Sequence, residues 1–186
     1  LDVMISTIFS LTSQRGHYTY YSKVPISSGD YFFETQITDL SFDTLSYIKS
    51  KCVDEIKKKY YEPLFSNIKN YKPTVRIGIL DTKGELDVPI GALANSYGYR
   101  SSDGALIGEG EYIYGNKEFK EGDVVGCLIH LKPPKPEFLK MEEDNIISDE
   151  SYLKFYINGI EQQEILKITE GNYYLGVTLF NHAQAD

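Results

Sequence analysis

Short runs of apolar and aromatic residues, each closed by a turn signal, recur along most of the chain and limit its fold more than any other feature. The run YFFETQIT at 31–38 alternates its side chains with a period of two, and Asn158-Gly159 is typical of a tight hairpin turn. Sixteen Tyr and nine Phe add to the preference for strands. About eight to ten short strands of this kind predict an all-β protein, an antiparallel β-sandwich with jelly-roll-like connections. Further strand-like runs lie at 17–24, 74–80, 124–131, 153–157 and 173–180.

Residues 41–72 break this rhythm. Their apolar residues recur at steps of three and four with charged residues between them, which indicates an amphipathic helix. Asp43 suits the N-cap and Pro63 suits a stop. We therefore expect one inserted amphipathic helix that packs on the outside of a sheet, and the alternative is a docking site for a partner helix. The apolar stripe consists of Leu45, Ile48, Cys52, Ile56 and Tyr60.

The formal net charge of -8 limits the partners of the chain. An acidic protein repels a phosphate backbone, so we expect no direct contact with nucleic acid. No apolar run is long enough to cross a bilayer, and we expect no membrane contact. Cys52 and Cys127 are far apart in unlike contexts, which favours free thiols in a reducing compartment.

Motifs for catalysis and cofactor binding are weak. His17, His130 and His182 are scattered without the spacing of metal ligands, so we expect no metal and no other cofactor. Glu85 and Asp87 are a carboxylate pair of the kind that a glycoside hydrolase uses, although a solvated turn explains them more simply. We therefore expect a protein that is not an enzyme, and a jelly-roll glycoside hydrolase is the rival from another class.

Two of the three arginines, Arg76 and Arg100, flank a short apolar stretch at 88–91 (VPIG), named the shelf below. A guanidinium group is a rigid fork of donors that matches a carboxylate or a phosphate. Two such forks beside an apolar shelf predict a pocket for an acidic peptide. The alternative, which composition alone favours, is that both arginines pair with Asp or Glu on neighbouring strands.

Several motifs occur in the order expected of a known family. The stretches VRIG at 75–78, GDVVGC at 122–127, FYING at 155–159 and YYLGV at 173–177 together resemble a SPRY domain. The resemblance covers the chain apart from 41–72. It implies a β-sandwich that binds other proteins and has no catalytic activity.

Within that family the chain most resembles the SPRY domain of the Ash-two/Bre-two subunit of COMPASS-type (MLL/SET) histone lysine methyltransferase complexes. The residues that carry this resemblance are DVPIG at 87–91, SYGYRS at 96–101 and an acidic insertion before LKFYING at 153–159. We expect a single SPRY domain over 1–186, truncated at its C-terminal end, with a helical insertion at 41–72 and an acidic loop at 132–152.

The resemblance implies a nuclear, non-catalytic scaffold of an H3-K4 type methyltransferase complex. Such domains bind an acidic or phosphorylated segment of the β-propeller subunit related to retinoblastoma-binding protein five, and the pair helps to activate the SET-domain enzyme. A Dpy-thirty-type dimer binds relatives through residues that would lie beyond this fragment. The alternative is a generic SPRY peptide-binding module of a ubiquitin ligase or another signalling protein.

The resemblance also implies which residues bind the peptide. The basic pocket of the family corresponds to Arg76, Pro89 and Arg100, and its tryptophan before the second arginine corresponds to Tyr99. One pocket tyrosine falls on either His17 or Tyr18, because the register of the first strand is open. Another pocket tyrosine, three residues after the proline, is Ala92 here, which removes one aromatic wall.

Overall fold

The computed structural model describes residues 10–13, 16–43, 46–47, 50, 72–81, 87–133 and 150–186. In these residues two antiparallel sheets pack face to face, which confirms the predicted all-β sandwich. One sheet has the order β1 (Leu11–Thr12), β13 (Gln184–Ala185), β3 (Gly29–Asp39), β8 (Val124–Leu131), β9 (Tyr152–Ile157) and β10 (Ile160–Glu161), with β11 (Leu166–Lys167) also paired to β9. The other has the order β2 (His17–Tyr21), β12 (Tyr174–Phe180), β4 (Thr74–Leu80), β5 (Ser96–Arg100), β6 (Leu106–Gly108) and β7 (Glu111–Ile113).

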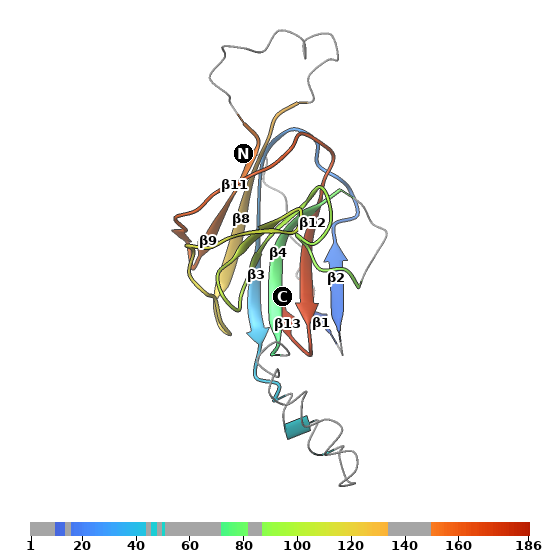
Figure 1. Cartoon of the computed structure of the whole chain (residues 1–186), viewed down its shortest axis with the longest axis vertical. Coiled ribbons are helices and arrows are strands. Elements are labelled where there is room, and N and C mark those ends of the chain that lie inside the picture. The colour runs from blue at the N-terminus through green and yellow to red at the C-terminus, as the bar shows by residue number, and fades with distance from the viewer. Residues whose placement is uncertain are drawn as a thin grey trace.

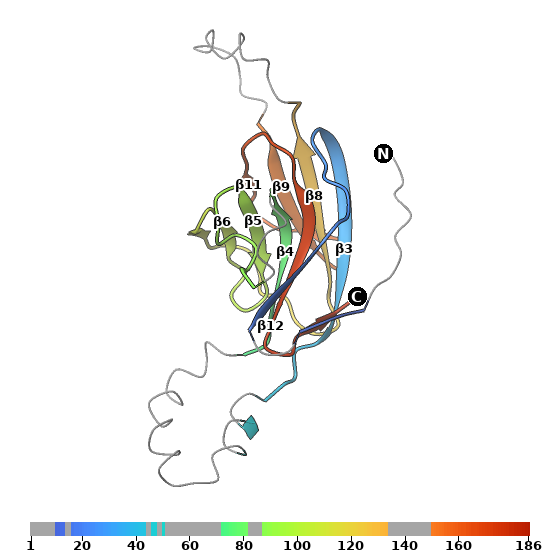
Figure 2. The same ribbon diagram turned by 90° about the vertical axis from the view of Figure 1, so that its right-hand side faces the viewer.

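The two layers are separate when the molecule is viewed edge-on. Figure 2 shows β3, β8 and β9 in one layer and β4, β5 and β12 in the other. Figure 1 gives the view turned by 90°, in which strands of the two layers overlap. The core lies between the layers and is formed by side chains that alternate inward along each strand. On β4 these are Val75, Ile77 and Ile79, each with no exposed surface, so Arg76 between them points to the outer face.

A row of glycines crosses the outer face of the six-stranded sheet. Gly176 on β12, Gly78 on β4 and Gly98 on β5 are direct neighbours in register. Because they have no side chains, Ile90 of the shelf can lie on the sheet, where it is 1% exposed. A Cβ atom at Gly98 would lie 2.7 Å from Ile90 Cγ2, and one at Gly176 would lie 2.8 Å from Ile90 Cδ1. The glycine row therefore fixes where the shelf lies.

Gly98→Ala is expected to destabilise the protein by about 1–3 kcal/mol, because the added methyl group collides with Ile90 and nearby backbone. The measurement is the free energy of unfolding by denaturant. Ile90→Ala removes part of the collision, so the double variant should lose less stability than the sum of the two single variants. Strictly additive losses would show that Gly98 and Ile90 do not interact.

Other sequence-based expectations have mixed outcomes. Cys127 is a free, buried thiol as predicted, and burial raises its pKa; Cys52 lies outside the described residues. The hairpin at Asn158-Gly159 is confirmed, since Ile157 pairs with Ile160 and both turn residues have positive φ angles of 50° and 77°. A strand that the sequence analysis did not predict, β7, lies at Glu111–Ile113.

The inserted helix stays a prediction. The Asp43 carboxylate accepts a hydrogen bond of 3.0 Å from the Ser46 backbone N–H, which is the geometry of an N-cap. Residues 51–71 lie outside the described residues, as do Glu85 and residues 134–149, which are most of the acidic loop predicted at 132–152. In the described part of the chain no helix is long and apolar enough to cross a membrane.

Candidate functional site

Arg76 and Arg100 lie side by side on the outer face of the six-stranded sheet. They are direct cross-strand partners on β4 and β5, and Thr178 on β12 is the partner of Arg76 on its other side. Adjacent residues of a strand face opposite sides, so the burial of Val75 and Tyr99 in the core places both guanidinium groups outside. The structure thus brings together the two arginines that the sequence analysis singled out.

The shelf is pinned beside this pair by hydrogen bonds from the sheet. Arg76 Nη1 donates to the Ile90 carbonyl at 2.9 Å, and the Ile90 N–H donates to Thr178 Oγ1 at 3.0 Å. Thr19 Oγ1 donates to the Val88 carbonyl at 2.9 Å and lies 2.8 Å from Thr178 Oγ1. These bonds hold the shelf and one edge of the Arg76 guanidinium in a fixed relation.

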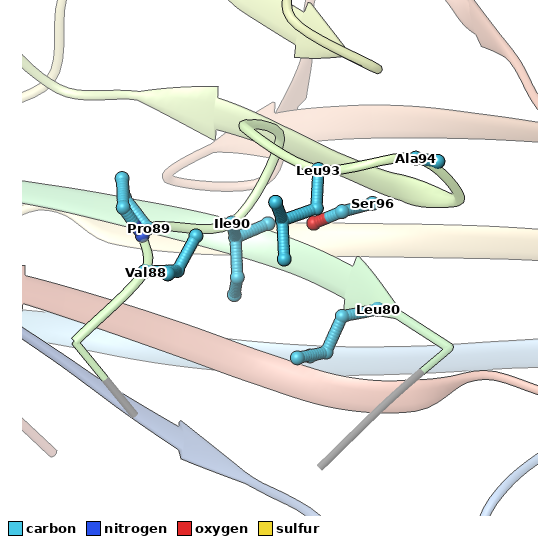
Figure 3. Close-up of a pocket in the computed structure, with 7 residues that line it drawn as sticks. All are labelled: Leu80, Val88, Pro89, Ile90, Leu93, Ala94 and Ser96. Atoms are coloured by element: carbon cyan, nitrogen blue, oxygen red, sulfur yellow. The ribbon is translucent and has the colours of Figure 1, made fainter. Parts of the chain in front are cut away.

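Pro89 belongs to the shelf and does not line the same hollow as the arginines. Figure 3 shows it with Val88 and Ile90 along a small apolar hollow that Leu80, Leu93, Ala94 and Ser96 complete. Ala92 is exposed, and its N–H donates to the Pro89 carbonyl at 3.1 Å. Pro89 and Ala92 therefore shape the backbone at the side of the arginine pair.

Arg76 and Arg100 line a cleft of about 510 Å³ on the outer face of the sheet. Its cations are Arg76, Arg100 and Lys72, and its carboxylate is Asp103. In a chain with a net charge of -8, a concave surface with this excess of positive charge favours an anionic guest. The described residues that line it are His17, Lys72, Thr74, Arg76, Arg100, Ser102, Asp103 and Phe180.

Arg100 has a partner within the chain. Its Nε and Nη2 donate to the two carboxylate oxygens of Asp103 at 2.9 and 2.5 Å, and this hydrogen bonding raises the pKa of Arg100. Burial works to raise the pKa of Asp103, but the hydrogen bonds from Arg100 and the Ala105 N–H bring it below its usual range. Arg100 therefore has an internal ion pair, although its partner lies in the turn after β5 and not on a neighbouring strand.

Arg76 is different, because no carboxylate of the described residues forms an ion pair with it. Burial, together with the nearby charge of Arg100, lowers the pKa of Arg76 to about 10, so the group is still charged at neutral pH. A partly buried cation without a carboxylate partner is costly, and an anionic guest would relieve that cost.

His17, rather than Tyr18, lies on the cleft side of β2. His17 is the cross-strand partner of Phe180 and stacks on its ring with centroids 4.4 Å apart. Tyr18 is the partner of the buried Leu179, so it faces the other side of the strand, where its ring lies 4.8 Å from that of Tyr20. Of the two residues between which the sequence analysis left the choice open, His17 therefore lines the cleft and Tyr18 does not.

The acid stability of the protein is expected to depend on His17. Burial and the charge of Arg76 lower its pKa to about 4, and its buried Nδ1 has no hydrogen-bond partner among the described residues. Since the unfolded chain binds the proton more tightly, stability falls as the pH drops from about 6.5 toward 4, by about 1–2 kcal/mol after solvent screening. Melting temperatures between pH 7.5 and 4.5 should fall less for His17→Phe, which keeps the stacking on Phe180. Equal slopes for the two proteins would contradict this role.

Tyr99 is corrected from a peptide contact to a core residue. Its side chain has no exposed surface, its ring lies 4.9 Å from that of Phe119 and 5.1 Å from that of Phe155, and its hydroxyl donates to the Lys117 carbonyl. It supports the strand that carries Arg100 and cannot touch a guest in the cleft.

Sequence reasoning missed Tyr112 and Asp103. The Arg100 Cζ atom lies 5.1 Å from the centroid of the Tyr112 ring, within the range of a cation–π contact. Asp103 follows Arg100 by three residues in a turn that returns the chain to β6, and this spacing was a usable signal. Tyr112 had no comparable signal, because its position depends on the pairing of β7 with β6.

Metal binding has no support in the described residues, where no cluster of three or more His, Cys, Asp or Glu side chains could hold an ion. Asp87 is exposed, whereas its proposed carboxylate partner Glu85 is not among the described residues. The arrangement of the described site fits recognition of an anion through fixed donors.

Comparison of the whole fold with solved structures decides the fold family. A human SPRY domain superposes with a TM-score of 0.59, at 16% sequence identity over 97% of this chain and 91% of that one. The SPRY domain of human HERC1 superposes with a TM-score of 0.56, at 14% identity over 95% and 86%. This chain has the SPRY fold.

Sequence comparison supports the narrower resemblance of this chain. It is 31% identical over 136 residues to the Set1/Ash2 histone methyltransferase complex subunit ash-2 of Caenorhabditis elegans. The aligned region is 70% of this chain and 23% of that relative, so the chain spans about a quarter of the length of the curated relative it matches. No protein-family model matches the chain. The resemblance to the Ash-two class is confirmed by this similarity.

Proposed function

We propose that this SPRY domain is a non-catalytic interaction module that binds an acidic or phosphorylated peptide segment through Arg76 and Arg100. The observation that carries the proposal is the guanidinium pair on the outer face, of which Arg76 has no carboxylate partner among the described residues. Phe180 and His17 supply apolar ring surface on one side of the pair, and the shelf supplies a fixed edge on another.

The expected binding free energy fits a short peptide. A charge-assisted hydrogen bond contributes about 1.5–3 kcal/mol net when it is partly desolvated. Two such contacts, with ring and shelf contacts in addition, suit an affinity of about micromolar strength. Since Asp103 already occupies one edge of the Arg100 fork, we expect Arg76 to supply the larger share.

We further propose that the segment belongs to a β-propeller subunit of a nuclear histone lysine (H3-K4 type) methyltransferase complex, and that the pair helps to activate its SET-domain enzyme. This assignment is supported by the similarity to ash-2, a subunit whose name places it in a Set1/Ash2 histone methyltransferase complex. The matching residues of the basic pocket, Arg76, Pro89 and Arg100, support the same assignment. Ala92 departs from the pattern and leaves the guest without one aromatic contact.

A peptide array tests the proposal. Acidic segments of the organism's own propeller subunits are displayed beside copies in which Asp and Glu are replaced by Asn and Gln, and the array is probed with the purified chain. We expect the chain to bind acidic copies only, more tightly when a serine in them is phosphorylated, and less tightly as salt is raised from 50 to 500 mM. Equal binding to acidic and neutral copies would instead favour a SPRY module that reads peptides without acidic preference.

A further inference from the structure

The last strand of the six-stranded sheet, β7, is exposed on both of its faces. Glu111, Tyr112 and Ile113 are all exposed, and no other strand of the described residues pairs with the outer edge of β7. An edge strand presents a row of backbone N–H and C=O groups that can pair with another chain. Proteins commonly guard such an edge with a very short strand, with charges such as Lys, or with Pro; β7 has three residues and the charge of Glu111, but it contains no Lys and no Pro.

Three apolar side chains are exposed at this edge, and we name them the tyrosine edge: Tyr112 and Tyr114, whose rings lie together, and Ile113, which faces the opposite side of the strand from Tyr112. The exposed fractions of Tyr112, Tyr114 and Ile113 are 47%, 62% and 41%, and the two rings lie nearly parallel at 14°, with centroids 6.4 Å apart. Exposed aromatic rings that lie together, as those of Tyr112 and Tyr114 do, are typical of interaction sites.

The tyrosine edge is continuous with the arginine pair. Tyr112 is the partner of Ile107, which is the partner of Gly98, so Tyr112 lies on the same outer face as Arg76 and Arg100. Its ring lies against the Arg100 guanidinium. A guest peptide that runs from the arginines across β6 would therefore pass Tyr112.

We propose that the acidic segment continues from the arginine pair to β7 and adds to the sheet there as a further strand. This inference rests on the proposed function, since its occupant is the same segment. Backbone pairing would supply affinity that does not depend on charge, and the tyrosine edge would pack against alternate side chains of the guest.

The spacing between strands sets how many guest residues lie between the Arg100 contact and the added strand. From β5 to a strand added outside β7 there are three inter-strand steps of about 4.8 Å, or about 14 Å. An extended residue covers about 3.3 Å, so about four residues separate the carboxylate on Arg100 from the strand-forming part of the guest. The guest residue that faces Glu111 should not be acidic, because like charges directly opposite each other are destabilising.

Four synthetic peptides test this inference by calorimetry with the 186-residue chain. The first is a hexaglutamate, and the second adds Gly-Ser-Gly-Ser and then Val-Thr-Val-Thr-Val to it. The third and fourth carry N-methyl groups on the two alternate sets of amides in the Val-Thr half. We expect the second peptide to bind at least tenfold more tightly than the first. One N-methylated set should lose that gain and the other should keep it, since only alternate amides face β7.

Hydrogen exchange supplies a second readout that does not require a variant protein. Amide exchange at residues 111–114 should slow with the second peptide and remain unchanged with the hexaglutamate. The inference is overturned if the extension adds no affinity, or if the two N-methylated peptides bind equally well. A hexaglutamate that does not bind would be a different result, because it would refute the arginine site itself and with it the added strand.

Discussion

Replacing Arg76 and Arg100 together with Gln is expected to lower the affinity for an acidic peptide by at least about 100-fold. Each guanidinium contact contributes about 1.5–3 kcal/mol, and about 2.7 kcal/mol corresponds to a 100-fold change in affinity. Gln removes the charge, and the shelf should stay in place because its hydrogen bonds to Thr178 and Thr19 remain. The measurement is the dissociation constant of a glutamate-rich peptide by calorimetry, together with the melting temperature.

The matched control is Lys167→Gln, which removes one charge from an exposed lysine on the other sheet. It should change the affinity less than twofold. Charge reversal of Arg100 is a poorer choice, because a new carboxylate would lie beside Asp103 and would itself destabilise the turn. If the Gln double variant bound the acidic peptide within twofold of the original protein, the arginine pair would not be the binding site.

Tyr99→Ala is expected to cost about 3–5 kcal/mol of stability, the largest loss that we expect from a single substitution near the site. The ring has no exposed surface and packs between Phe119 and Phe155, so its removal leaves a cavity between the sheets. For a chain of this size the melting temperature should fall by about 6–20 °C. Thermal and denaturant unfolding measure the loss.

The variant Tyr99→Phe distinguishes a role of Tyr99 in core packing from a direct contact with the peptide. It keeps the ring and removes only the hydrogen bond to the Lys117 carbonyl, which costs about 0.5–1.5 kcal/mol. Because the hydroxyl does not reach the cleft, the affinity for an acidic peptide should change less than twofold. A tenfold loss of affinity with unchanged stability would return Tyr99 to the binding surface.

Local sequence patterns were sufficient for the architecture of the described residues. Alternation with a period of two and the Asn158-Gly159 turn predicted strands and a hairpin that the structure contains. The same alternation also excluded one of our site assignments. Tyr99 and Arg100 are adjacent on β5, so they face opposite sides, and Tyr99 could not have shared the outer face with Arg100.

The remaining site residues depended on pairing between strands far apart in sequence. His17 is placed beside the cleft by its partner Phe180, and no local pattern states that β2 pairs with β12 in this register. Tyr112 depends in the same way on a strand of three residues, which is shorter than a periodic pattern can reveal. Motif resemblance identified Arg76 and Arg100 but left Tyr112 unnoticed.

The glycine row beneath Ile90 affects the entropic cost of binding a guest. Because these glycines let Ile90 lie on the sheet, the Ile90 carbonyl is placed where it orients the Arg76 guanidinium as the chain folds. An arginine side chain carries about 2 kcal/mol of rotational entropy when it is free, and part of this is already lost before any guest arrives. An anionic guest would therefore bind with little further ordering of Arg76, which lowers the entropic cost of binding.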